Sequence, residues 1–186
     1  MDFKFHLENA WNVMLKHIVT LLIMTLILLV VSIFTLGVLG PVVFAGYMQA
    51  IIQMLRDGRE PRIDDLFSQM RLFLPLFSFF IVSAIAITVG FILFVLPGLA
   101  IIVAVSFGCI YMLPLMTDQR MDIIAAIKTS WDMAVKESVA EHLVVVILYI
   151  GLVSIGGSVF IGLLFTLPFA TVFLASAYLE KTKVSE

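Results

Sequence analysis

The sequence predicts an all-α, polytopic membrane protein with six transmembrane helices arranged as three hairpins. This prediction depends on the composition, the distribution of formal charge, and the positions of glycine and proline. Hydrophobic residues make up 62% of the 186 residues and charged residues 13%, which is about half the charged share of soluble domains. A soluble protein of this length exposes too much surface to bury so many apolar side chains. The composition therefore excludes a disordered protein, a nucleic-acid binder and an ordinary cytosolic enzyme.

Formal charge is absent from three long stretches of the chain. These stretches are 18–55, 72–117 and 143–179, and their lengths are 38, 46 and 37 residues. One helix of about 20 residues crosses the hydrocarbon core of a bilayer, so each stretch is long enough for two crossings. The spans are expected at about 18–36, 41–55, 75–96, 97–117, 139–155 and 158–179.

Turn-forming residues lie near the middle of each neutral stretch, where a hairpin needs its turn. These residues are Gly37, Gly40 and Pro41 in the first stretch, Pro97 and Gly98 in the second, and Gly156 and Gly157 in the third. All 11 lysines and arginines lie outside the stretches, on the side of the termini and of the two longer loops. The positive-inside rule therefore predicts a multi-pass protein with both termini in the cytoplasm.

An amphipathic segment with helical periodicity precedes each predicted hairpin. These segments lie at about 3–18, 63–74 and 123–135, and Asp64 is the expected N-cap of the second. Trp11 and Trp131 are on the apolar faces of the first and third segments. An indole ring suits the headgroup level of a bilayer, so both tryptophans are predicted interfacial anchors on helices that lie in the membrane surface.

The order of surface helix, outward span, turn and inward span occurs three times within a single transmembrane domain. The hairpin units cover about 1–57, 58–118 and 119–186. Trp11 precedes Pro41 by 30 residues and Phe67 precedes Pro97 by 30 residues. This spacing indicates a pseudo-threefold repeat; the alternative is that any six-span protein with short turns has such a pattern. Pro168 falls within the sixth span, where it is expected to kink the helix.

The sequence contains no group of residues that indicates catalysis. No formal charge falls inside the three neutral stretches, and the motifs of phosphate-binding loops, hydrolases and metal sites are absent. The sequence therefore predicts no enzyme activity, no cofactor and no metal. The single cysteine excludes an internal disulfide bond. The candidates for intramembrane polar contacts are Gln49, Gln53, Tyr111 and Tyr149.

The charged loops form most of the surface predicted to lie outside the bilayer. Their candidates for docking a partner are Arg56, Arg59, Arg120 and Lys128. Because acidic residues are interspersed with these basic ones, the loops are also typical of solvated turns, and contact with anionic headgroups is a further alternative.

Several short motifs carry a resemblance to a known family. They are Gly58-x-Glu60-Pro61-x-x-x-Asp65-Leu66-Phe67, Leu96-Pro97-Gly98, Asp118-Gln119-Arg120 and Ala126-x-x-x-Ser130-Trp131. Their order resembles a broad group of bacterial six-span proteins that is similar to the membrane domain attached to some glycerophosphodiester phosphodiesterases. The resemblance covers about residues 10–180 and implies an inner-membrane module linked to envelope or lipid processes. Nothing in the chain corresponds to the catalytic barrel of those enzymes.

Two functions are compatible with these observations. The first is a non-enzymatic scaffold or accessory subunit of the bacterial inner membrane, which docks a membrane or cytoplasmic protein through its cytoplasmic face. The alternative is a small transporter or pore for an uncharged or lipid-like solute, working as a homo-oligomer and lined by the four intramembrane candidates. The bilayer itself is the partner that the composition requires, and the net charge of −2 implies no nucleic acid.

Overall fold

The computed structural model describes residues 3–136 and 138–184. It is 86% helical, with no strand among these residues, so the predicted all-α class is confirmed. The elements in chain order are α1 (Phe3–Lys16), α2 (Ile18–Phe34), α3 (Gly40–Asp57), the 3₁₀ turns η1 (Ile63–Phe67) and η2 (Met70–Leu72), α4 (Phe73–Leu93), α5 (Val95–Gly108), α6 (Met112–Asp118), α7 (Ile123–Lys136), α8 (Val139–Gly157) and α9 (Phe160–Val184). Asp2, Glu137 and Glu186, which belong to the predicted charged segments, lie outside the described residues.

Four helical segments in the described part of the chain are long and apolar enough to cross a membrane. They are Ile63–Leu93, Val95–Asp118, Val139–Gly157 and Ile161–Thr182, and they overlap the last four predicted spans. Helices α1 and α2 make a fifth candidate when taken together, but they are bent by 89° at their junction. The structure therefore supports a membrane protein with four or five crossings. The second predicted span, at 41–55, is not confirmed.

The segment 41–55 belongs to α3, which is surrounded by other elements. Helix α3 packs against α2, α4, α6, α9 and both 3₁₀ turns, and ten of its residues are buried. Because protein encloses α3, its polar groups can be satisfied inside the molecule. The Tyr47 hydroxyl donates to Thr25 Oγ1 on α2 at 3.0 Å, and Thr25 in turn donates to the Leu21 carbonyl at 2.8 Å. This enclosure explains why α3 is less apolar than the four candidate spans.

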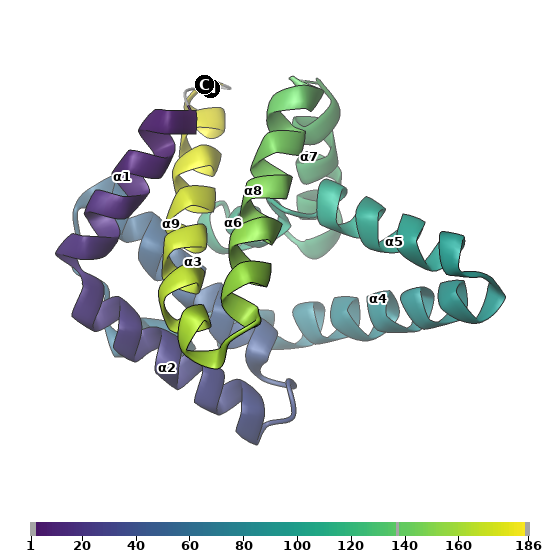
Figure 1. The fold of residues 1–186 in the computed structure, drawn as a ribbon, viewed down its shortest axis with the longest axis horizontal. Helices are drawn as coiled ribbons and strands as arrows, with labels where there is room; N and C mark the ends of the chain where they lie inside the picture. The colour runs from purple at the N-terminus through teal and green to yellow at the C-terminus, as the bar shows by residue number, and fades with distance from the viewer. Residues whose placement is uncertain (1–2, 137, 185–186) are drawn as a thin grey trace.

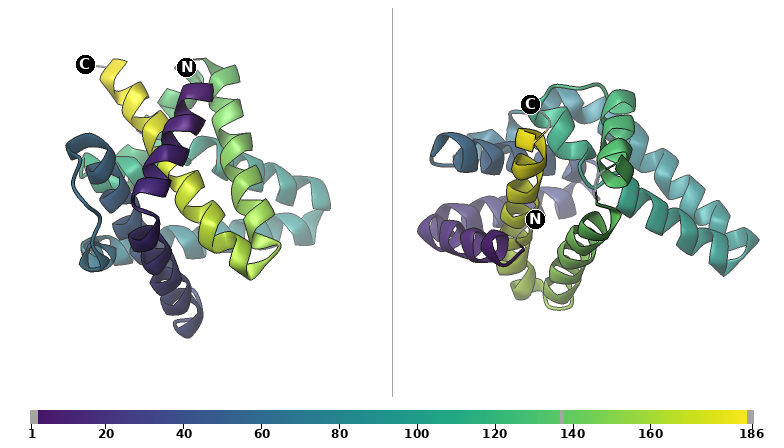
Figure 2. Two further views of the ribbon diagram at one scale, coloured as in Figure 1. Left: turned by 60° about the vertical axis from the view of Figure 1, so that its left-hand side comes forward. Right: turned by 90° about the horizontal axis from the view of Figure 1, so that it is seen from above.

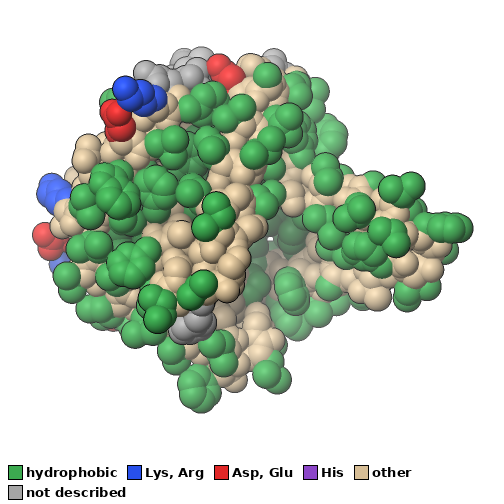
Figure 3. Space-filling view, viewed as in Figure 1, with side chains coloured by type: hydrophobic (Ala, Val, Ile, Leu, Met, Phe, Trp, Pro, Cys, Tyr) green, Lys and Arg blue, Asp and Glu red, His purple; other side chains and the backbone are tan. Residues whose placement is uncertain are grey.

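Two helical pairs extend from this centre. Helices α4 and α5 pack along each other and project from the rest of the molecule, whereas α8 and α9 run across that direction (Figure 1). Figure 2 shows the same projecting pair from two other sides. Hydrophobic side chains cover the projecting pair, and the charged side chains seen on this face lie along the left and upper edges of the molecule (Figure 3). Such an extensive apolar surface is typical of helices that contact lipid.

The segment that precedes each helical pair packs against a helix from another part of the chain. Helix α1 packs on α9, η1 packs on α3, and α7 packs on both α5 and α6. The contact between α1 and α9 also brings the two ends of the described chain to the same side of the molecule (Figure 1).

Helices α1 and α7 bury a different face from the apolar face predicted for them. The buried residues are His6, Ala10 and Met14 on α1, and Ala126, Ser130 and Ala134 on α7. Mostly small residues at this spacing allow close helix packing. Trp11 and Trp131 each follow the central buried residue and are 51% and 48% exposed. The apolar faces point outward, as expected for helices whose apolar side chains contact lipid rather than protein.

The second predicted surface helix, 63–74, consists of the two 3₁₀ turns and the start of α4. The expected N-cap Asp64 is wrong, because η1 has Arg62 as its N-cap residue, and the Asp65 carboxylate accepts a hydrogen bond from the Arg62 backbone N–H at 2.9 Å. The Arg59 guanidinium holds the same carboxylate, at 2.5 and 2.7 Å. Asp65 is therefore fixed at the beginning of η1 by a contact that local periodicity does not reveal.

Candidate functional site

Polar side chains from three separate segments meet in a pocket of about 480 Å³. Helix α3 contributes Gln49, Gln53 and Arg56, whose spacing places them on one helical face. The remaining lining residues come from the end of α3, the 3₁₀ turns, and the end of α6 with the turn that follows it: Asp57, Ser68, Gln69, Arg71, Thr117, Asp118 and Arg120. The pocket therefore lies where two candidate membrane-crossing segments, Ile63–Leu93 and Val95–Asp118, have their charged ends.

A network centred on Asp118 connects three helices at the wall of this pocket. The Arg56 guanidinium donates two hydrogen bonds to the Asp118 carboxylate, each 2.6 Å long. The Tyr178 hydroxyl on α9 donates to the same carboxylate at 3.0 Å. The Asp118 side chain is only 6% exposed, whereas that of Arg56 is 46% exposed. The hydrogen bonds to Asp118 raise the pKa of Arg56 above its ordinary value, so the pair is ionic and bidentate.

The two glutamines of the pocket are held differently. Arg59 donates to Gln53 Oε1 from one guanidinium nitrogen while another holds Asp65, which fixes the Gln53 amide. In contrast, Gln49 Oε1 is buried and has no hydrogen-bond partner among the described residues. The Gln49 amide therefore has unused hydrogen-bonding capacity at the wall of the pocket.

Two further arginines line the pocket without a carboxylate partner in the described part of the chain. Arg71 donates to the Met116 carbonyl at 3.4 Å and to Gln69 Oε1 at 3.3 Å, and both bonds are long. Arg120 has a φ of 53°, in the left-handed region that reverses the chain after α6. Both side chains are exposed. The pocket thus holds two positive charges that no ion pair among the described residues neutralises.

The structure separates the four residues predicted to make intramembrane polar contacts. Gln49 and Gln53 line the polar pocket, whereas Tyr111 is fully buried elsewhere, with its ring 5.4 Å from that of His142 and 6.3 Å from that of Tyr178. Among the described residues, Tyr111 is therefore not gathered at one site with the two glutamines.

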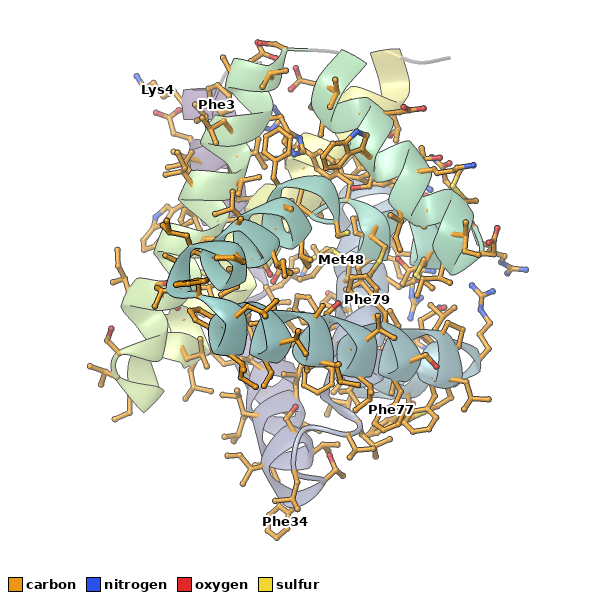
Figure 4. The ribbon with its side chains drawn as sticks, turned by 90° about the vertical axis from the view of Figure 1, so that its right-hand side faces the viewer. Phe3, Lys4, Phe34, Met48, Phe77 and Phe79 are labelled. Atoms are coloured by element: carbon orange, nitrogen blue, oxygen red, sulfur yellow. The ribbon has the colours of Figure 1, made fainter. Side chains whose placement is uncertain are left out.

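Tyr149 lines a second, mostly apolar pocket of about 250 Å³ between α3, α4, α5, α6, α8 and α9. Phe44, Met48 and Phe79 line the same pocket, and Figure 4 shows Met48 and Phe79 close together between α3 and α4. Helix α3 thus presents Gln49 and Gln53 to the polar pocket and Phe44 and Met48 to the apolar one.

The residues predicted for docking also separate into groups. Arg56 and Arg120 line the polar pocket, and Arg59 is next to it through its contact with Gln53. Lys128 is exposed on α7 and lines neither pocket. Pro168, the predicted kink, lies inside α9, which continues on both sides of it.

Sequence reasoning missed several buried polar residues that hold the helices together. His6 Nδ1 is 2.7 Å from Ser176 Oγ, and His6 Nε2 contacts Glu180, so α1 is bound to the end of α9. His142 Nε2 donates to the Phe107 carbonyl at 2.7 Å. Asp118 and Tyr178 are equally difficult to find, because the residues that they contact are about 60 positions away. The helical spacing of Gln49, Gln53 and Arg56 was the one sequence signal for the pocket.

Comparisons of the chain with protein-family models, curated proteins and solved structures find no match. Among residues 3–136 and 138–184, no cluster of three or more His, Cys, Asp or Glu side chains could hold a metal ion. The resemblance to bacterial six-span proteins therefore stays a prediction.

Proposed function

We propose that this protein is a non-enzymatic integral protein of the bacterial inner membrane that acts as a scaffold or accessory subunit. The observation that supports this function best is the gathering of charged side chains around the polar pocket. Arg56, Arg59 and Arg120 meet there from three different segments, next to helices whose exposed surface is apolar. A water-soluble segment of a partner protein can form charge-assisted hydrogen bonds at this end of the molecule, but not along the apolar helices.

The proposed topology has six crossings and places both termini in the cytoplasm, with α3 as a crossing shielded from lipid. It is supported by the way α1, η1 and α7 pack. With units at 1–57, 58–118 and 119–186, each of these leading segments contacts the return helix of the preceding unit, and α1 closes the ring on α9. Each leading segment also places a fully buried residue just before a half-exposed aromatic one, at 10–11, 66–67 and 130–131. A pseudo-threefold repeat would produce both features.

Charge reversal tests the docking function. Arg120→Glu and Lys128→Glu should each reduce the amount of a partner that co-purifies from native membranes, and the double variant should reduce it about tenfold or more. Both side chains are exposed, so the variants should stay folded. Lys4→Glu is the control, because Lys4 is 85% exposed on α1 and distant in sequence from the docking residues. Quantitative mass spectrometry of the purified complexes measures the effect, and unchanged capture by the double variant would contradict docking.

The second candidate function is a small transporter or pore for an uncharged or lipid-like solute. One observation favours it: α3 contributes to both the polar pocket and the apolar pocket, so a solute could pass from one to the other along this helix. Gln49→Leu should then abolish solute flux in proteoliposomes, whereas Gln69→Leu, in the segment between the two 3₁₀ turns and away from α3, should leave most of it. A lack of flux for a broad panel of solutes would remove this candidate.

A further inference from the structure

We propose that the polar pocket binds the phosphate group of an anionic lipid headgroup, held by Arg71 and Arg120. This site goes beyond protein docking because its ligand is a component of the membrane. Arg120 also belongs to the proposed docking surface, but Arg71 does not, so the two proposals can be tested with different variants.

The charges that line the pocket favour an anion. Three arginines and two aspartates surround it. Arg56 and Asp118 neutralise each other through their bidentate contact, which leaves Arg71 and Arg120 opposed by Asp57 alone. The planar guanidinium group binds phosphate through two parallel hydrogen bonds. The pocket therefore has the donors and the surplus positive charge that a phosphate group needs.

Gln49 adds a further donor at the wall of the pocket. Its side-chain oxygen is buried without a partner. Rotating the amide by half a turn exchanges this oxygen for the NH₂ group, which is a hydrogen-bond donor. Gln49 lines the pocket, so a phosphate group bound there would lie next to an amide that has unused hydrogen-bonding capacity.

The surroundings of Arg71 favour a lipid over a soluble phosphate. Phe67, Met70 and Leu74 are 42%, 39% and 70% exposed, and they alternate with the pocket residues Ser68, Gln69 and Arg71. A soluble anion gains nothing from contact with apolar side chains. A phospholipid has a phosphate group for the arginines and acyl chains for the apolar side chains.

The apolar surface continues along α4 from these residues. The rings of Phe73 and Phe77 stack with their centroids 5.6 Å apart, and Phe77 points away from Met48 and Phe79 (Figure 4). The segment Ile63–Leu93 begins at this level and continues as a candidate crossing. Arginine side chains at the end of a membrane-crossing segment are well placed for headgroup phosphates, so one lipid could occupy the pocket and the adjacent α4 surface together.

Native mass spectrometry of the purified full-length protein tests this site. The protein in detergent is titrated separately with phosphatidylglycerol, phosphatidylcholine and inorganic phosphate. Phosphatidylglycerol should bind more tightly than the other two. Arg71→Gln and Arg120→Gln should each weaken its binding about fivefold, because a basic residue near a membrane surface contributes about that factor. Asp57→Asn should strengthen binding, since it removes the one opposing charge.

Arg62→Gln is the matched control, because Arg62 is exposed on the same loop but does not line the pocket. An equal loss of phosphatidylglycerol binding in Arg62→Gln would overturn the site, since it would indicate a general effect of surface charge. Inorganic phosphate or phosphatidylcholine binding as tightly as phosphatidylglycerol would also overturn it. Where an arginine variant fails to fold, Asp57→Asn still tests the site. An unchanged affinity of Asp57→Asn for phosphatidylglycerol would contradict the proposal. No protein partner is present in this assay, so its outcome is independent of docking.

Discussion

Replacing Gly46 with alanine should destabilise the folded protein by more than about 3 kcal/mol. A Cβ atom at this position would lie 2.3 Å from the Leu66 carbonyl oxygen and 2.4 Å from the Asp65 carbonyl oxygen. Both are backbone atoms of η1, so a change of rotamer cannot relieve the clash. Helix α3 and η1 would have to separate, which would open the contact between the first two proposed units and disturb Asp65, the partner of Arg59.

Gly151→Ala is the control for this prediction. Gly151 lies inside α8, and a Cβ atom there would meet nothing within 4 Å. Since alanine favours a helix over glycine by about 1 kcal/mol, this variant should be as stable as the parent or slightly more stable. Thermal unfolding of both variants in detergent, followed by size-exclusion chromatography of the soluble fraction, gives the comparison. Similar melting temperatures for the two variants would show that η1 does not pack on α3 as described.

The second large effect is expected for Arg56→Ala, which should reduce the free energy of unfolding by about 2 kcal/mol. The change leaves the Asp118 carboxylate, 6% exposed, without its bidentate partner. Removing one member of a fully buried pair costs about 3–5 kcal/mol. The expected loss here is smaller, about 2 kcal/mol, because Arg56 is nearly half exposed. Asp118→Ala should cost less than Arg56→Ala, because water can hydrate the guanidinium that remains.

A double-mutant cycle measures this coupling. The variant carrying both Arg56→Ala and Asp118→Ala should be more stable than the sum of the two single effects predicts, since it contains no unpaired charge. Equilibrium unfolding in mixed micelles at increasing denaturant concentration gives the free energies. Additive effects would mean that the two side chains do not form the ion pair. Arg56 is also unsuitable for charge-reversal tests of docking, because any loss of binding would be mixed with a loss of stability.

The four C-terminal spans could be predicted because a bilayer acts on each segment separately. Length and apolar composition suffice to recognise a candidate crossing, and Ile63–Leu93, Val95–Asp118, Val139–Gly157 and Ile161–Thr182 satisfy both conditions. Helix α3 is different, because its surroundings are other helices rather than lipid. Those helices bury ten of its residues, so α3 does not need a strongly apolar surface. A hydropathy profile along the chain does not show which helices surround a segment. The faces of α1 and α7 that are buried against protein depend on neighbouring helices in the same way, and the sequence pattern does not reveal them.

Only part of the candidate site could be found from the sequence. The spacing of Gln49, Gln53 and Arg56 correctly places them on one helical face, which is a local property. The contact between Arg56 and Asp118 connects residues 62 positions apart, and Tyr178 reaches Asp118 from a different helix. Arg120 was predicted as a docking residue of a charged loop, and its position at the pocket depends on the left-handed turn after α6. Such tertiary contacts leave no periodic pattern.

Cysteine accessibility in intact cells tests the proposed topology most directly. In a Cys109→Ser background, Leu96→Cys and Ser158→Cys place thiols at the turns of two helical pairs, and Ser68→Cys places one at the polar pocket; all three positions are exposed. If the charged end is cytoplasmic, a membrane-impermeant maleimide should label positions 96 and 158 from the periplasm of intact cells and position 68 only after lysis. Labelling of position 68 in intact cells, or of positions 96 and 158 only after lysis, would contradict the proposed topology, in which the charged end is cytoplasmic.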